Sequence, residues 1–161
     1  MVITKQLEKN LVLSILKLAD EIHRFRSIIS EKYDLTSQQW LILLYLADDP
    51  NIPKVNGQAG QRTILASELA DALRTSRPNI TNLVNQLLKK GFVHQVKDNK
   101  DNRRKVLQLT SKGIHVLDEI EPYRDKYTSR LFEHLDPSDL EKMIEIIEGC
   151  LHRINSGQVR I

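Results

Sequence analysis

Cysteine and long apolar runs are scarce in this sequence of 161 residues. Cys150 is the single cysteine, so no disulfide can form within the chain and a reducing, cytoplasmic setting is expected. No apolar run approaches the ~20 residues that a membrane-spanning helix needs. The opening segment MVITKQLEKN lacks the apolar block of a signal peptide. These absences argue against a membrane protein and a disulfide-rich secreted protein.

Motifs for catalysis and metal binding are also missing. None of the histidines stands three or four residues from another histidine or a cysteine, the spacing that local metal sites use. A site assembled from distant helices stays open. There is no Gly-rich phosphate loop and no nucleophile elbow. The sequence therefore predicts a protein that is not an enzyme, with no cofactor and no metal.

Positive charge is concentrated in one quarter of the chain. The formal net charge is only +3, yet the stretch from Arg74 to Lys112 holds ten Lys and Arg against two acids, Asp98 and Asp101, a local charge of +8. A polyanion is attracted to such a stretch and repelled by the remainder. The alternative is a solvated surface with uneven charge.

Two long amphipathic helices are predicted outside the basic stretch. Apolar residues recur every three or four positions from Leu7 to Ile29, and again from Leu140 to Ile154. Pro122 predicts a kink near Glu121 in a helix that begins at Ser111. The two apolar faces favour dimerisation, with packing inside one subunit as the alternative.

Two short helices are predicted before the basic stretch, and a third helix lies within it. A helix starts near Thr36 or Ser37, a second follows over LASELADAL, and a third runs over SRPNITNLVNQLLKKG, capped by Thr75 or Ser76 and ended by Gly91. The polar face of this third helix contains amides, hydroxyls and bases but no acid. Such groups hydrogen-bond base edges and phosphates.

Alternating patterns then predict a β-hairpin. FVHQVKD and RKVLQLT are separated by the polar turn DNKDNRR. Helix, turn, helix and basic hairpin is the plan of a winged helix-turn-helix. The predicted fold is mainly α with a small β-wing (α+β), divided into an N-terminal dimerisation helix (1–34), a DNA-binding lobe (35–110) and C-terminal dimerisation helices (111–161).

Three segments in this order resemble the MarR family of bacterial transcriptional regulators. They are LTSQQWLILLYL, then LASELADAL with SRPNITNLVNQLLKKGFV, and DNRRKVLQLTSKG, in which Asp101 and Arg103 have the family's Asp-x-Arg spacing. The resemblance implies a homodimer with interlaced terminal helices that binds a palindromic operator, usually as a repressor. The loop from Asp48 to Arg62 is longer than the family usually has.

Double-stranded DNA is thus the expected partner, with no membrane partner. Groove contacts are expected from the third helix, phosphate contacts from Arg74, Lys89 and Lys90, and a minor-groove contact from Arg103. Asp101 is expected to orient the Arg103 guanidinium or to serve as a turn residue. The predicted DNA-binding residues are Arg74, Thr75, Ser76, Arg77, Asn79, Thr81, Asn82, Asn85, Gln86, Lys89, Lys100, Asp101, Arg103, Arg104 and Lys105.

The resemblance also implies a small aromatic or anionic effector. Phe25, Tyr33, Trp40 and Tyr45 are its predicted pocket, although core packing is the favoured role of Trp40. The leading hypothesis is a ligand-responsive transcriptional repressor. The alternative is a winged-helix module that binds proteins rather than an operator.

Overall fold

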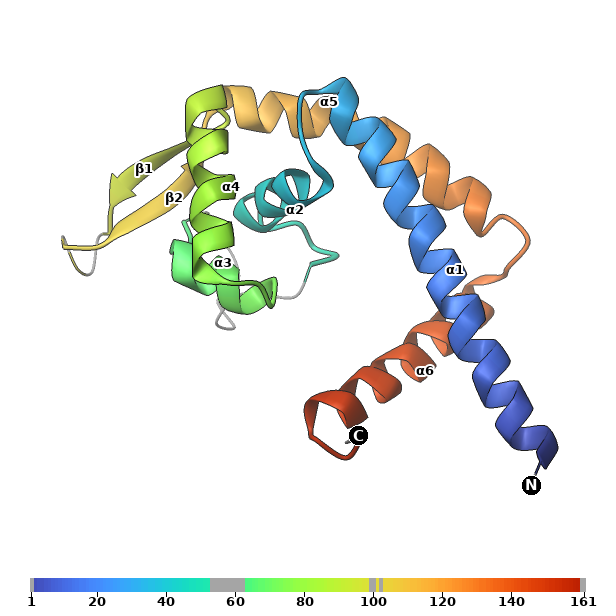
Figure 1. Ribbon diagram of the computed structural model, residues 1–161. Coiled ribbons are helices and arrows are strands. Elements are labelled where there is room, and N and C mark those ends of the chain that lie inside the picture. Colours follow the sequence, from blue (N-terminus) through green and yellow to red (C-terminus); the bar gives the residue numbers. More distant parts are fainter. Residues whose placement is uncertain (1, 53–62, 99–100, 102, 160–161) are drawn as a thin grey trace. The chain divides into compact units, whose positions relative to one another are not determined.

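The protein is mainly helical with one small antiparallel hairpin, as its sequence predicts (Figure 1). The computed structural model describes residues 2–52, 63–98, 101 and 103–159. The elements in chain order are α1 (Val2–Lys32), α2 (Ser37–Leu46), α3 (Ala66–Ala72), α4 (Arg77–Lys90), β1 (Val93–Lys97), β2 (Lys105–Leu109), α5 (Ser111–Leu131) and α6 (Pro137–Asn155). The chain forms two compact units, residues 1–121 and 122–161, with the boundary inside α5.

The core of the first unit is built around α2. Seven of the ten α2 residues are buried, so this helix contacts its neighbours on almost every side. Apolar residues of the following elements close over it. The fully buried apolar side chains are Ile42, Leu43, Leu46, Leu69, Ile80, Leu87, Leu107 and Ile120.

Side-chain caps fix where the central helices begin and end. Thr36 accepts a hydrogen bond from Gln39 N at 3.2 Å, and the Gln39 side chain accepts one from Thr36 N at 3.0 Å. This capping box satisfies two N–H groups at the start of α2. The Ser76 side chain accepts from Asn79 N at the start of α4, and Gly91, with φ 73°, ends that helix in the left-handed region. Thr36 and Ser76 were both cap candidates in the sequence, and Gly91 was the predicted stop.

The hairpin pairs β1 with β2 from Val93↔Leu109 to Lys97↔Lys105. A further backbone pairing joins it to the segment before α3. Ile64 N donates to Leu107 O at 3.2 Å, and Leu107 N donates to Ile64 O at 2.8 Å. The sequence does not predict this bridge, which ties the middle of β2 to the segment just before α3.

The terminal helices leave much apolar surface uncovered. Along α1 the side chains from Thr4 to Glu21 are exposed, and α6 contains no buried residue.

Asp136 caps α6 by accepting from Asp139 N at 3.0 Å, ahead of a proline in the first turn. α5 is helical without a break through Pro122, so the helix does not end there. The kink near Glu121 stays a prediction. Among the described residues, no helix combines the length and apolar content needed to cross a membrane.

Candidate nucleic-acid interface

The helix α4 separates cleanly into an apolar and a polar face. Ile80, Leu83, Val84 and Leu87 are buried against the core. The opposite face is polar and contains no acidic side chain. Its exposed predicted contact residues are Arg77, Thr81, Asn82, Asn85 and Lys89. Because the apolar side holds the helix to the lobe, the polar side is presented outward as a unit.

Two other predicted contact residues of α4 are engaged within the protein. Asn79 is partly buried and donates from Nδ2 to Thr75 Oγ1 at 3.0 Å. Gln86 is partly buried as well, and accepts at Oε1 from Gln39 Nε2 at 2.7 Å. Its own Nε2 donates to Asn82 Oδ1 at 3.4 Å. The structure therefore places Gln86 between the core and the exposed face rather than fully on it.

The turn between α3 and α4 has a constrained backbone. Arg74 adopts φ 48°, in the left-handed region, and Thr75 N donates to Ala70 O at 3.0 Å. Ser76 is used as the N-cap of α4. The turn thus places the exposed residue Arg74 shortly before the N-terminal end of α4, where backbone N–H groups favour anions.

The hairpin presents a row of bases near its tip. Arg103, Arg104 and Lys105 are all exposed. Asp101 accepts a hydrogen bond from Arg103 N at 3.0 Å, and its other carboxylate oxygen lies 3.4 Å from Arg104 Nε. Of the two roles expected for Asp101, the structure shows the turn residue. Its carboxylate pairs with Arg104 and not with the Arg103 guanidinium. Lys100 lies outside the described residues.

Lys90 and Lys112 close the other end of α4. Lys90 Nζ lies 2.5 Å from Asp34 O and 3.3 Å from Asp34 Oδ1, at the point where α1 has ended. Lys112 Nζ donates to Lys90 O at 2.7 Å and lies 4.6 Å from the ring centroid of Phe92. The sequence predicted a phosphate contact for Lys90, but its ammonium is directed to the end of α1. Lys89, by contrast, is exposed.

The predicted effector residues pack in or against the core. Trp40 is only 2% exposed, with the Arg26 guanidinium 5.8 Å from its ring centroid, so the structure supports the packing role. Burial raises the pKa of the Tyr45 phenol and lowers the pKa of Arg26. Tyr33 donates from its hydroxyl to Glu119 O at 3.3 Å. Phe25 is partly buried beside the same core.

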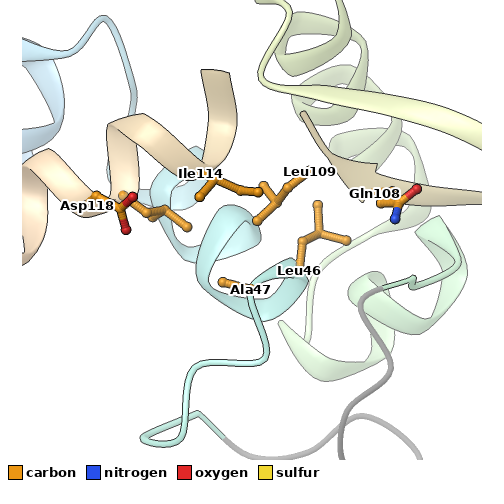
Figure 2. Close-up of a pocket in the computed structure, with 7 residues that line it drawn as sticks. Leu46, Ala47, Gln108, Leu109, Ile114 and Asp118 are labelled. Atoms are coloured by element: carbon orange, nitrogen blue, oxygen red, sulfur yellow. The ribbon is translucent and has the colours of Figure 1, made fainter. Parts of the chain in front are cut away.

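A small apolar cleft lies elsewhere, between the end of α2, the end of β2 and the start of α5. Figure 2 shows Leu46, Leu109 and Ile114 directed into it, with Asp118 and Gln108 at opposite sides. Its volume is about 200 Å³, and Ala47 and Leu117 complete the lining. None of the four predicted effector residues lines it. A wider cleft of about 480 Å³, between the ends of α1 and α4 and the first turns of α5, includes Tyr33 but not the other three.

Sequence patterns contain no signal for the smaller cleft, because its lining combines the end of α2 with β2 and α5, which lie far from α2 in the chain. Each residue that lines it is also a normal core or surface residue of its own element. In the part of the chain that the structure describes, no three His, Cys, Asp or Glu side chains gather as a metal site would require.

Comparisons with known proteins give this geometry a context. Residues 33–104 match the model described as MarR family. The transcriptional repressor MprA of Escherichia coli (strain K12) is 31% identical over 93 residues, which cover 58% of this chain and 53% of MprA. The HTH-type transcriptional regulator FarR of Neisseria gonorrhoeae is 34% identical over 97 residues, covering 60% and 58%. The match thus spans little more than half the length of these relatives.

The fold itself matches over most of the chain. The S. aureus protein MepR, solved as a complex with DNA, aligns with a TM-score of 0.71 at 22% identity, covering 87% of this chain and 93% of MepR. This similarity confirms the predicted winged helix-turn-helix with long terminal helices. The matched segment contains α2, α3, α4 and β1. By the family match over residues 33–104 and the shared fold, the chain is similar to the MarR family of winged-helix proteins.

Proposed function

We propose that this protein is a homodimeric transcriptional regulator that binds a palindromic DNA operator. The observation that supports this most strongly is the exposed, acid-free face of α4, which stands beside a basic hairpin in a stretch with ten Lys and Arg against two acids. A solvated helix face usually mixes acids with bases. A face of amides, hydroxyls and bases instead suits the hydrogen-bond groups of the major groove and the phosphates beside it.

In this proposal the two parts of the lobe have separate tasks. The exposed residues of α4, Arg77, Thr81, Asn82 and Asn85, enter the major groove. Arg74 and Lys89 contact phosphates at the two ends of the helix. Arg103 reaches into the minor groove from the hairpin, where a narrow A·T-rich groove attracts arginine.

Dimerisation is proposed from the uncovered apolar faces. Leu11 and Ile15 on α1 are 57% and 51% exposed, and Ile147 and Leu151 on α6 are 48% and 52% exposed. Apolar surface of this extent marks an interaction site. A two-fold dimer with recognition helices about 34 Å apart, one turn of DNA, reads two equivalent half-sites.

We also propose that the protein represses transcription and that it responds to a small effector. MprA is named a repressor, and repression is the sign we propose here, acting on DNA in the cytoplasm. We further propose a small aromatic or anionic effector that weakens operator binding. The cleft beside Tyr33 is lined by Lys89, Lys90 and Lys112 against Asp34 and Glu119, and this excess of positive charge supports an anion.

The test is a binding titration of the purified full chain on the DNA upstream of its own gene. A duplex of equal length and shuffled sequence is the control. We expect tighter binding to the upstream DNA, and the logarithm of affinity falls with the logarithm of salt by about 0.9 for each phosphate contact. Equal binding to both duplexes, or none at low salt, contradicts the proposal and favours the protein-binding alternative. Adding candidate aromatic acids to the same titration tests the effector.

A further inference from the structure

A line of hydrogen-bonded amides connects the start of α2 to the exposed face of α4. It begins at the main-chain N–H of Thr36, which donates to Gln39 Oε1 at 3.0 Å. Gln39 is fully buried, and its Nε2 donates to Gln86 Oε1 at 2.7 Å. Gln86 Nε2 in turn donates to Asn82 Oδ1 at 3.4 Å. The three side chains Gln39, Gln86 and Asn82 are called the amide relay below.

The direction of the amide relay is fixed at its buried end. A backbone N–H can only donate, so Gln39 must turn its oxygen toward Thr36 and its NH₂ group toward Gln86. Gln86 then accepts from Gln39 with its oxygen, and its own NH₂ group donates to Asn82. Reversing the Gln86 amide would set its NH₂ group against the NH₂ group of the buried Gln39, where an unmade hydrogen bond is costly.

The exposed end of the relay therefore has a defined chemistry. Asn82 Oδ1 already accepts from Gln86, and Asn82 Nδ2 is the group left for a partner outside the protein. Asn79 offers a contrast on the same helix, because its amide is held by the Thr75 hydroxyl. A hydroxyl both donates and accepts, so it does not fix which end of an amide faces outward.

We propose that Gln39, which is too deeply buried to touch DNA, is a positioning residue that sets the base preference of Asn82. Through Gln86 it makes Asn82 a hydrogen-bond donor toward the groove, so that Asn82 selects base-edge acceptors: purine N7, guanine O6 or thymine O4. The amino groups of adenine and cytosine, which need an acceptor, are disfavoured at that position. This inference rests on the proposed operator binding and names one of its specificity determinants.

Gln39→Glu tests the direction of the relay. A glutamate at this position still accepts from Thr36 N, so the capping box is kept, but it has no NH₂ group to donate to Gln86. Gln86 then turns its NH₂ group inward, Asn82 follows, and Asn82 Oδ1 faces the groove. We expect the preferred base to change at one position of each half-site, by roughly tenfold in relative affinity, while the other positions keep theirs.

The measurement is selection of bound duplexes from a randomised library by the purified full-length protein, at a pH where the new carboxyl group is ionised. Gln38→Glu is the matched control, because it adds the same charge one residue away at an exposed position that is outside the relay. The control is expected to select the wild-type sequence. Identical selected sequences for wild type and Gln39→Glu overturn the proposal.

A second substitution tests the relay independently, in case the Gln39→Glu protein does not fold. Gln86→Met keeps the length of a partly buried side chain but removes both of its hydrogen-bonding ends, which frees the Asn82 amide to rotate. The same position of each half-site is then expected to accept donors and acceptors about equally. Unchanged preference in this variant also overturns the inference. If the wild-type protein enriches no sequence at all, the proposed function is wrong, and that result is distinct from failure of the relay alone.

Discussion

Arg103 is exposed near the tip of the hairpin, and its backbone N–H is held by Asp101. This hydrogen bond fixes the backbone of Arg103 and does not use its guanidinium group. We expect Arg103→Ala to weaken operator binding by about 1–3 kcal/mol, as measured by fluorescence anisotropy. Arg130→Ala removes the same charge from an exposed position on α5, outside the basic stretch, and is the control. Equal affinities for the two variants remove Arg103 from the interface.

Gly113 allows the first turn of α5 to approach the start of β1. A Cβ at this position lies 2.2 Å from Phe92 O, a distance that requires the backbone to move. The same turn is held by Thr110, which accepts from Gly113 N at 3.1 Å and donates to Gly91 O at 2.7 Å. We expect Gly113→Ala to lower the free energy of unfolding by about 1–3 kcal/mol in urea denaturation.

Gly149 is the matched control for that substitution. It lies within α6, and a Cβ there meets nothing within 4 Å. Since alanine is the better helix former, Gly149→Ala is expected to leave stability unchanged or raise it by up to about 1 kcal/mol. If Gly113→Ala is as stable as Gly149→Ala, the close approach to Phe92 is not a constraint on the fold.

At the residue scale, sequence patterns predict exposure better than they predict partners. The outward face of α4 follows from the spacing of Ile80, Leu83 and Leu87, which fixes the rotation of the helix. The partner of Asp101 does not follow from spacing, because Arg103 and Arg104 are both within reach of a carboxylate in a tight turn. The engagement of Gln86 with Gln39 depends on packing between α2 and α4, 47 positions apart in the chain.

Two neighbouring lysines at the C-terminal end of α4 have different surroundings. Lys89 is exposed, whereas Lys90 contacts Asp34 beyond the end of α1. We expect Lys89→Met to reduce the salt slope of DNA binding by about 0.9, because one phosphate contact is lost. Lys90→Met is expected to leave that slope unchanged and to lower affinity by loosening the position of α4. The measurement is affinity across a salt series, and a reduced slope for Lys90→Met contradicts this division.

Element boundaries are largely predictable here because the stop and start signals are local. Thr36, Ser76 and Asp136 are caps whose side chains bond within three residues, and Gly91 adopts the left-handed φ that its position after α4 requires. The pairing of Ile64 with Leu107 is different. A single bridge has no alternating pattern, so only the folded chain reveals it. Pro122 lacks one donor, and α5 continues through it.

The whole molecule is expected to be a dimer that depends on its terminal helices. Leu151→Glu places a charge on the exposed apolar face of α6, and dissociation is expected because an unpaired buried charge is costly. Light scattering should report a mass near 18.6 kDa for this variant and twice that for the wild type. Lys142→Glu puts the same acid on the polar side of α6 and should remain dimeric. A wild-type mass of one chain contradicts dimerisation.

Because the apolar faces of α1 and α6 are uncovered in one chain, the stability of these helices is expected to depend on the concentration of the protein. A helix without a buried residue, as α6 is within one chain, receives little stabilisation from its own surroundings. Its ordering then depends on encounter with a second surface, and mass action makes that encounter rarer as the protein is diluted. At low protein concentration the terminal helices are thus expected to unfold more often, and the protein to be degraded faster. The lifetime of the protein in the cell would then rise with its concentration.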